Sequence, residues 1–119
     1  MAEQFNNSQM RIKEFLEKTA CYEEIGENMY IQPPRPCIIC KDGFSMSVQA
    51  GKFLYSIPKE NLRDGNYTHV EVGFPSKEEE LLKPYNNDIY GYVPVEVVDE
   101  IIGKHGGIDI SKTIRSNKN

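Results

Sequence analysis

The spacing of hydrophobic positions changes along this 119-residue chain, and each spacing predicts a different kind of element. Near the N-terminus, Ser8 is suited to cap a helix that ends near Ala20. The apolar stripe of this helix, at the positions i, i+3, i+4 and i+7, consists of Ile12, Phe15, Leu16 and Thr19. One such stripe is typical of a helix that packs with one face on a core.

The middle of the chain alternates apolar and polar residues with the period of two that is typical of strands. The short apolar run 37–40 and the alternating segment 44–50 flank the tight-turn triplet Lys41-Asp42-Gly43 and predict a hairpin. Segment 68–74 predicts a strand with one solvated face, because Val70 and Val72 alternate with polar residues. Shorter strands are expected at 28–31, which three prolines close, and at 53–57.

The C-terminal half predicts two helices. Ser76 and Glu79 match a capping box, and Pro84 ends that short helix early. An extended segment at 89–93 leads to Pro94, which suits the first turn of a second helix ending near Lys104–His105. The core stripe of this second helix consists of Val97, Val98, Ile101 and Ile102. The fold class is therefore α+β: a mostly antiparallel sheet of four or five strands packed by two or three helices.

Length and composition are those of a single domain covering residues 1–119, with 1–7 and 111–119 expected to be disordered. No stretch approaches the roughly 20 apolar residues that a membrane span needs, and no signal peptide is visible. Three cysteines, an odd number, are most simply free thiols in a reducing compartment. We expect a cytoplasmic protein with no membrane partner.

The chain carries a net charge of −4, and its last ten residues contain three bases and no acid, so the first 109 residues carry −7. An acidic body disfavours direct nucleic-acid binding, which depends on phosphate neutralisation. Acidic side chains are concentrated at 78–80 and at 96–100, and both groups are expected on solvated faces. Glu79 and Glu80 are therefore candidates for contact with a basic partner.

The cysteines offer the only metal-like or thiol-like pattern. Cys37 and Cys40 have the spacing of half a zinc knuckle, but no second pair exists, and Cys21 with a histidine would have to complete the site. A strand at 37–40 sends the two sulfurs to opposite faces, so we expect free, poorly reactive thiols and no cofactor. His69 is expected to be an exposed surface residue, and His105 to suit a helix end. No nucleophile motif or phosphate loop is present, so we do not expect an enzyme.

Tyrosines are the most unusual feature, numbering seven of the twelve aromatic residues. Tyr85, Tyr90 and Tyr92 surround an Asn-Asn-Asp turn, and Gly91 permits close approach by another chain or a flat ligand. These rings either bind a ligand or cover the core from the strand ends. Nearby loops contain three cations, Arg35, Lys59 and Arg63.

Three segments, 40–50, 72–76 and 90–108, resemble small uncharacterised proteins encoded in phages and prophages of Firmicutes. The resemblance covers most of residues 9–108 and carries no catalytic motif. It implies a phage accessory protein in a bacterial cytoplasm, of the kind that antagonises host anti-phage immunity. Such proteins bind an immune effector, as anti-CRISPR proteins do, or sequester a nucleotide second messenger.

The leading hypothesis is a non-catalytic phage counter-defence protein that acts by binding a host defence protein or a nucleotide signal. Blocking an effector would use Glu79 and Glu80, whereas capturing a nucleotide would need a cationic, aromatic pocket. The candidates for that pocket are Tyr55, Arg63, Tyr90 and Tyr92. Two alternatives are a small metal- or thiol-dependent protein using Cys21, Cys37 and Cys40, and a phage structural or replication accessory module. Homo-oligomer formation is left open.

Overall fold

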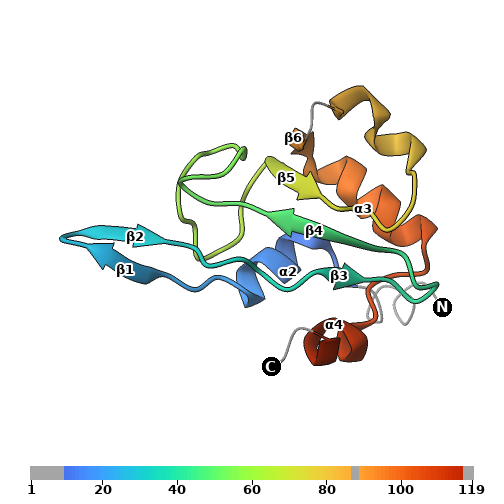
Figure 1. Cartoon of the computed structure of the whole chain (residues 1–119), viewed down its shortest axis with the longest axis horizontal. Helices are drawn as coiled ribbons and strands as arrows, with labels where there is room; N and C mark the ends of the chain where they lie inside the picture. Colours follow the sequence, from blue (N-terminus) through green and yellow to red (C-terminus); the bar gives the residue numbers. More distant parts are fainter. Residues whose placement is uncertain (1–9, 87–88, 117–119) are drawn as a thin grey trace.

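The computed structural model describes residues 10–86 and 89–116, with the elements labelled in Figure 1. They are α2 (Ile12–Lys18), β1 (Glu23–Gly26), β2 (Met29–Ile31), β3 (Ile38–Ile39), β4 (Ser45–Gln49), β5 (His69–Gly73), the 3-10 helix η1 (Glu80–Tyr85), β6 (Tyr90–Pro94), α3 (Val95–Lys104) and α4 (Ile110–Ser116). Two antiparallel sheets with helices confirm the predicted α+β class. Within the described ranges, every helix is too short or too polar to cross a membrane.

The main sheet has four antiparallel strands in the order β3-β4-β5-β6. The predicted hairpin is confirmed: Ile38 pairs with Met46, and Gly43 turns the chain with a φ of +98°. The predicted strand at 68–74 is β5, in which Val72 pairs with Val48 of β4 and Val70 pairs with Val93 of β6. The alternation in sequence therefore places one valine row of each strand on the same buried face.

Helices α2 and α3 supply the rest of the core and contact each other. The fully buried side chains from α2, α3 and the sheet are Ile12, Leu16, Ile38, Met46, Val48, Val70, Val72, Val93, Val98 and Ile101. The backbone N–H of Ile12 donates to Asp99 Oδ1 (2.8 Å), which joins the start of α2 to α3. The expected stripe is confirmed for both helices, except that Val97 is only partly buried and that Thr19, also partly buried, follows the end of α2. Ser8, the predicted cap, lies outside the described residues.

Two predicted elements are absent. Segment 53–57 contributes only an isolated bridge between Ile57 and His69, because the chain there turns on itself and Ser56 Oγ bonds the Gly51 carbonyl. The capping box at Ser76 does not form. Ser76 instead pairs with the first residue of β4: its N–H donates to the Ser45 carbonyl (2.8 Å) and its Oγ accepts from the Ser45 N–H (2.9 Å).

The C-terminal segment corrects a second expectation. Residues 111–116, predicted to be disordered, belong to α4 (Ile110–Ser116), and residues 117–119, like 1–7, lie outside the described part. Asp109 Oδ1 accepts from the Lys112 N–H (2.9 Å), and the Ile39 N–H donates to the buried Thr113 Oγ1 (3.0 Å). A single buried threonine thus ties the helix to the edge of the sheet. The predicted end of α3 is confirmed, because Gly106 and Gly107 have φ values of +91° and +94°.

A two-stranded ribbon was only half predicted. Strands β1 and β2 pair with each other and extend away from the main sheet, at the left of Figure 1. Expected strand 28–31 corresponds to β2, whereas β1 carries the sequence Glu-Glu-Ile-Gly, which has too few apolar residues for a pattern. The ribbon contributes no residue to the buried core.

Candidate functional site

The structure places the predicted site residues in different parts of the molecule. Tyr55 and Tyr92 come together at a surface hollow, and Lys59 joins them. Arg63 lies elsewhere, with its guanidinium 4.6 Å from the centre of the Tyr22 ring. Glu79 is buried in a polar network rather than exposed. The hollow and the network are the two arrangements that need a chemical explanation.

The first arrangement, the tyrosine pocket, comprises Tyr55, Tyr92 and Lys59 with the hollow beside them. The two ring centres are 5.7 Å apart and their planes are inclined by 43°. The Lys59 ammonium lies 5.0 Å from the centre of the Tyr55 ring and 5.9 Å from that of Tyr92. Both tyrosines are exposed over more than two fifths of their surface. The pocket therefore presents a cation and two aromatic rings to solvent together.

The hollow has a volume of about 840 Å³, compared with about 300 Å³ for the one beside Met10 and Glu96. Its described lining residues are Tyr55, Pro84, Tyr85, Asn86, Ile89, Gly91 and Tyr92. They come from three places in the sequence: the loop after β4, the end of η1 and the start of β6. A hollow of this size suits a small organic ligand.

A bulge in the sheet brings the two tyrosines together. The register between β5 and β6 shifts at Val70/Val72, and Tyr92 has a φ of +54°, in the left-handed region. Its N–H, turned out of the β5 ladder, donates to the Tyr55 carbonyl (3.1 Å). The Tyr55 N–H in turn donates to Glu71 Oε1 (3.0 Å). A non-glycine residue in this conformation costs on the order of 1–3 kcal/mol, and such strain is concentrated at functional sites.

Gly91 is needed for this packing. A Cβ atom at position 91 would lie 3.2 Å from Tyr55 Cβ, closer than ordinary contact. The sequence predicted a close approach at this glycine, and the approaching group is Tyr55 of the same chain. The glycine therefore lets the loop after β4 rest directly on β6.

Three other residues that the sequence singled out do not belong to the pocket. Tyr90 is partly buried and packs against the core, and it does not line the hollow. Arg63 lines a separate hollow with Tyr22, Tyr30 and Asn61. Arg35 is buried, and its Nη1 donates to the Ala50 carbonyl (2.6 Å) while its Nε donates to Thr19 Oγ1 (2.8 Å). Burial lowers the pKa of Arg35, whose role is to tie α2 to the end of β4.

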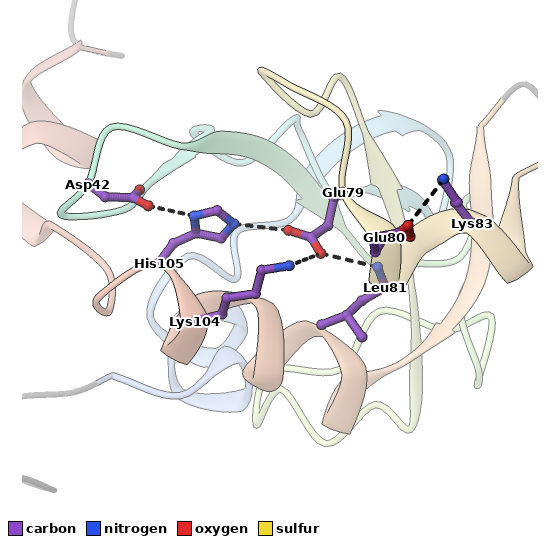
Figure 2. A network of polar contacts seen from close by, with 7 residues as sticks. All are labelled: Asp42, Glu79, Glu80, Leu81, Lys83, Lys104 and His105. Carbon is purple, nitrogen blue, oxygen red and sulfur yellow. Dashed lines mark hydrogen bonds and ion pairs between the residues drawn. The ribbon is translucent and has the colours of Figure 1, made fainter.

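The second arrangement is a chain of polar contacts around His105, shown in Figure 2. The His105 ring lies between two carboxylates, with Nδ1 2.6 Å from Asp42 Oδ2 and Nε2 2.9 Å from Glu79 Oε1. Lys104 Nζ donates to Glu79 Oε2 (2.7 Å), as does the Leu81 N–H (3.1 Å). We call these residues the histidine network. It joins the β3–β4 turn, the start of η1 and the end of α3.

The electrostatics of the network favour its charged form. Burial alone would raise the pKa of Glu79, but hydrogen bonds from Lys104 and His105 outweigh it and lower the pKa to about 2. Burial would likewise lower the pKa of His105, yet the contacts with Glu79 and Asp42 raise it. The pKa of Asp42 is lowered by the Phe44 N–H and then by His105. An imidazolium between two carboxylates is therefore the stable form.

The network is saturated. Both ring nitrogens of His105 face a carboxylate, and the ring stacks on Phe44 with centres 4.1 Å apart. Only 1% of the Glu79 side chain is exposed, which corrects the prediction of a solvated acid available to a partner. Glu80 is exposed as predicted, but it pairs with Lys83 (3.3 Å). The network thus acts as a clamp between three elements, with no free nitrogen for acid–base chemistry.

The three cysteines lie in different environments. Cys21 is exposed, Cys37 is half-buried and Cys40 is buried. Burial raises the pKa of Cys40 to about 11, so this sulfur stays protonated and is a poor nucleophile or ligand. Across residues 10–86 and 89–116, no group of three or more His, Cys, Asp or Glu side chains is arranged so that it could hold a metal ion.

Comparison with known proteins gives no relative: no family model, no curated protein and no solved structure matches the chain. Function must therefore be argued from the chemistry of the two arrangements. The sequence indicated the tyrosine pocket through its rings and Lys59, but it did not indicate Glu71 or the network partner Asp42. An acid in a strand and an acid in an Asp-Gly turn both have commoner explanations.

Proposed function

We propose that the protein is a non-catalytic binding protein that captures a nucleotide-like ligand, a planar ring bearing a phosphate, in the tyrosine pocket. The observation that carries this proposal is the position of Lys59 beside two solvent-exposed tyrosine rings at the edge of a hollow of about 840 Å³. The tyrosine rings can stack on the planar ring of such a ligand, and the lysine can contact its phosphate.

The energetics of each half support the proposal. Stacking of a base on an aromatic side chain contributes about 1–3 kcal/mol, and it requires a ring face that the protein leaves open. A lysine beside the same rings supplies a charge-assisted contact for a phosphate. Lys59 makes no ion pair with any described residue, so its charge is available. On an acidic chain, a local cation of this kind is the feature that attracts an anion.

The lining of the hollow favours binding over catalysis. Among the described lining residues there is no Ser, Cys, His, Asp or Glu, and the only ionisable side chains are those of Tyr55, Tyr85 and Tyr92. Together with the resemblance to phage and prophage proteins, this supports a counter-defence role in which a nucleotide immune signal is sequestered. The alternative based on acidic side chains is weaker, because Glu79 is buried and Glu80 is paired with Lys83.

Titration calorimetry with adenosine monophosphate, adenosine and ribose 5-phosphate tests this proposal. We expect the monophosphate to bind best, because only it offers both a ring and a phosphate. Lys59→Ala should weaken the monophosphate about tenfold while leaving adenosine nearly unchanged, since a charge-assisted contact contributes about 1.5–3 kcal/mol.

The matched control is Lys52→Ala, which removes a cation of the same loop whose ammonium lies 5.9 Å from the Phe53 ring, whereas that of Lys59 lies beside Tyr55 and Tyr92. This control should bind the monophosphate like the wild type. An equal loss of affinity for the monophosphate in both variants would show that only the net charge of the protein matters. Absence of binding by all three compounds would contradict the proposed ligand class.

A further inference from the structure

The ribbon formed by β1 and β2 projects from the main sheet, and its two edges differ (Figure 1). The β2 edge is tied to the loop after β4, because Asn61 Nδ2 donates to the Tyr30 carbonyl (3.2 Å). The base is held by Gln32, which bonds the Cys21 N–H (2.9 Å) and the Thr19 carbonyl (3.2 Å). Along β1, no described residue outside the ribbon forms a hydrogen bond with the backbone of Glu23–Gly26. Within the described part of the chain, the β1 edge is therefore unpaired.

The side chains of the ribbon combine acid with exposed apolar surface. Ile25, Met29 and Tyr30 are 54%, 45% and 44% exposed. Residues 19–34 contain three glutamates and no lysine or arginine. Charged residues commonly protect an open strand edge from pairing with another copy, which explains the glutamates. That protection does not explain three large apolar side chains left in solvent on the same ribbon.

We propose that β1 is a docking edge for an extended, basic segment of a partner protein. Such a segment would add a strand to the ribbon: the backbone of β1 supplies hydrogen bonds, Glu23 and Glu24 attract lysine or arginine, and Ile25 supplies an apolar anchor. The same charges select against a second copy of this chain, because two ribbons with a charge of −3 each repel each other.

The ribbon is built to present this edge without rearrangement. Asn28 adopts a φ of +59° in the turn, a conformation that asparagine tolerates well. The register shift between Glu24 and Gly26 leaves Ile25 as an extra residue of β1, so regular pairing is available only at Glu23 and Glu24. Docking is therefore confined to the base of the ribbon, near the body of the protein.

The test uses ¹⁵N-labelled protein and a synthetic peptide about seven residues long, the length of an ordinary strand, in which a Lys-Lys pair with one lysine on each face is flanked by valines. A glutamate–valine peptide of equal length is the charge control. We expect the basic peptide to change the chemical shifts of the β1 amides and to slow their hydrogen exchange, and we expect the acidic peptide to do neither. Changes spread over the acidic residues of α3, with none at β1, would overturn it.

Two pairs of variants separate a docking edge from general electrostatic attraction. Glu23→Lys with Glu24→Lys should weaken the peptide about tenfold, whereas Glu14→Lys with Glu17→Lys, exposed on α2, should change affinity less than about twofold. Ile25→Ser should weaken binding, whereas Ile114→Ser, equally exposed on α4, should not.

Equal losses in test and control variants would overturn the proposal, because they would show that only net charge matters. A dimer in sedimentation experiments that Glu23→Lys with Glu24→Lys abolishes would also overturn it, because the edge would then be occupied by a second copy. The tyrosine pocket contributes no residue to the ribbon, so failure here leaves the proposed nucleotide site untouched.

Discussion

The tyrosine pocket and the histidine network both gather charged and aromatic side chains, yet they do so in opposite ways. In the network, each charge faces a partner: His105 meets two carboxylates, and Glu79 accepts from Lys104, His105 and the Leu81 N–H. In the pocket, Lys59 has two ring faces but no ion-pair partner among the described residues, and the rings remain exposed. Saturated groups contribute to stability, whereas groups left open at a strained bulge can contribute to binding.

Removing Glu79 should have the largest effect on stability. Glu79→Ala leaves His105 and Lys104 without their shared carboxylate, and breaking a buried ion pair costs about 3–5 kcal/mol. The free energy of unfolding in urea measures this loss. Glu80→Ala, the exposed neighbour paired with Lys83, should cost less than about 1 kcal/mol. Similar losses in the two variants would contradict the clamp.

The pH dependence of stability should follow the network. The pKa of His105 is raised above 6.5, so its contribution is complete below that pH and disappears as the pH rises through the folded value. The pKa of Glu79 is lowered from 4.5 to about 2, so its contribution is complete above 4.5 and disappears as the pH falls toward 2. The network should therefore stabilise most between these two limits, at mildly acidic pH.

Urea unfolding of the wild type across pH 5–9 should show an alkaline loss of stability, in the range where a histidine with a raised pKa releases its proton. His105→Gln should remove that loss, and His69→Gln, which changes the other histidine, should keep it. A profile that does not differ between the two variants would show that the alkaline change arises outside the network.

Tyr92 should show the reverse balance of effects. Tyr92→Gly relieves a φ of +54° but removes an exposed ring, so stability should change by no more than about 1 kcal/mol. Binding of adenosine monophosphate should fall by about tenfold or more, because stacking contributes about 1–3 kcal/mol. A large loss of stability with unchanged affinity would make Tyr92 a core residue.

The smallest effect is expected at Tyr22. Its hydroxyl is buried and has no hydrogen-bond partner among the described residues, and burial raises its pKa. Tyr22→Phe should therefore be neutral or stabilising by up to about 1 kcal/mol in urea unfolding, because an unsatisfied polar group is removed. Clear destabilisation would reveal a partner for this hydroxyl.

The sequence predicted the elements whose pattern is local. The hairpin at Gly43, strand β5 and helix α3 follow from alternation, turn residues and a helical stripe within each segment. Prediction from the sequence failed where the position of a residue depends on a partner that is distant in the sequence. Ser76 bonds Ser45 of β4, Glu79 bonds Lys104, and Thr113 of α4 bonds Ile39. None of these partners can be identified from the residues next to it in the sequence.

The candidate site followed the same rule. Tyr55, Tyr92 and Lys59 were identified by residue type, because aromatic and cationic loop residues suit binding wherever they lie. Their assembly depends on the bulge in β6 and on the Tyr55 carbonyl that accepts from the Tyr92 N–H, which are tertiary features. Arg63, of equally suitable type, lies instead against Tyr22.

The most direct test of the central claim is an NMR titration of protein with ¹³C-labelled tyrosine rings against adenosine monophosphate. We predict ring-current shifts for Tyr55 and Tyr92 that saturate together, with the buried Tyr67 unaffected and the response weakened in Lys59→Ala. Shifts centred on Tyr22 and Tyr30, which line the hollow of Arg63, would contradict the account, as would no shift in any ring.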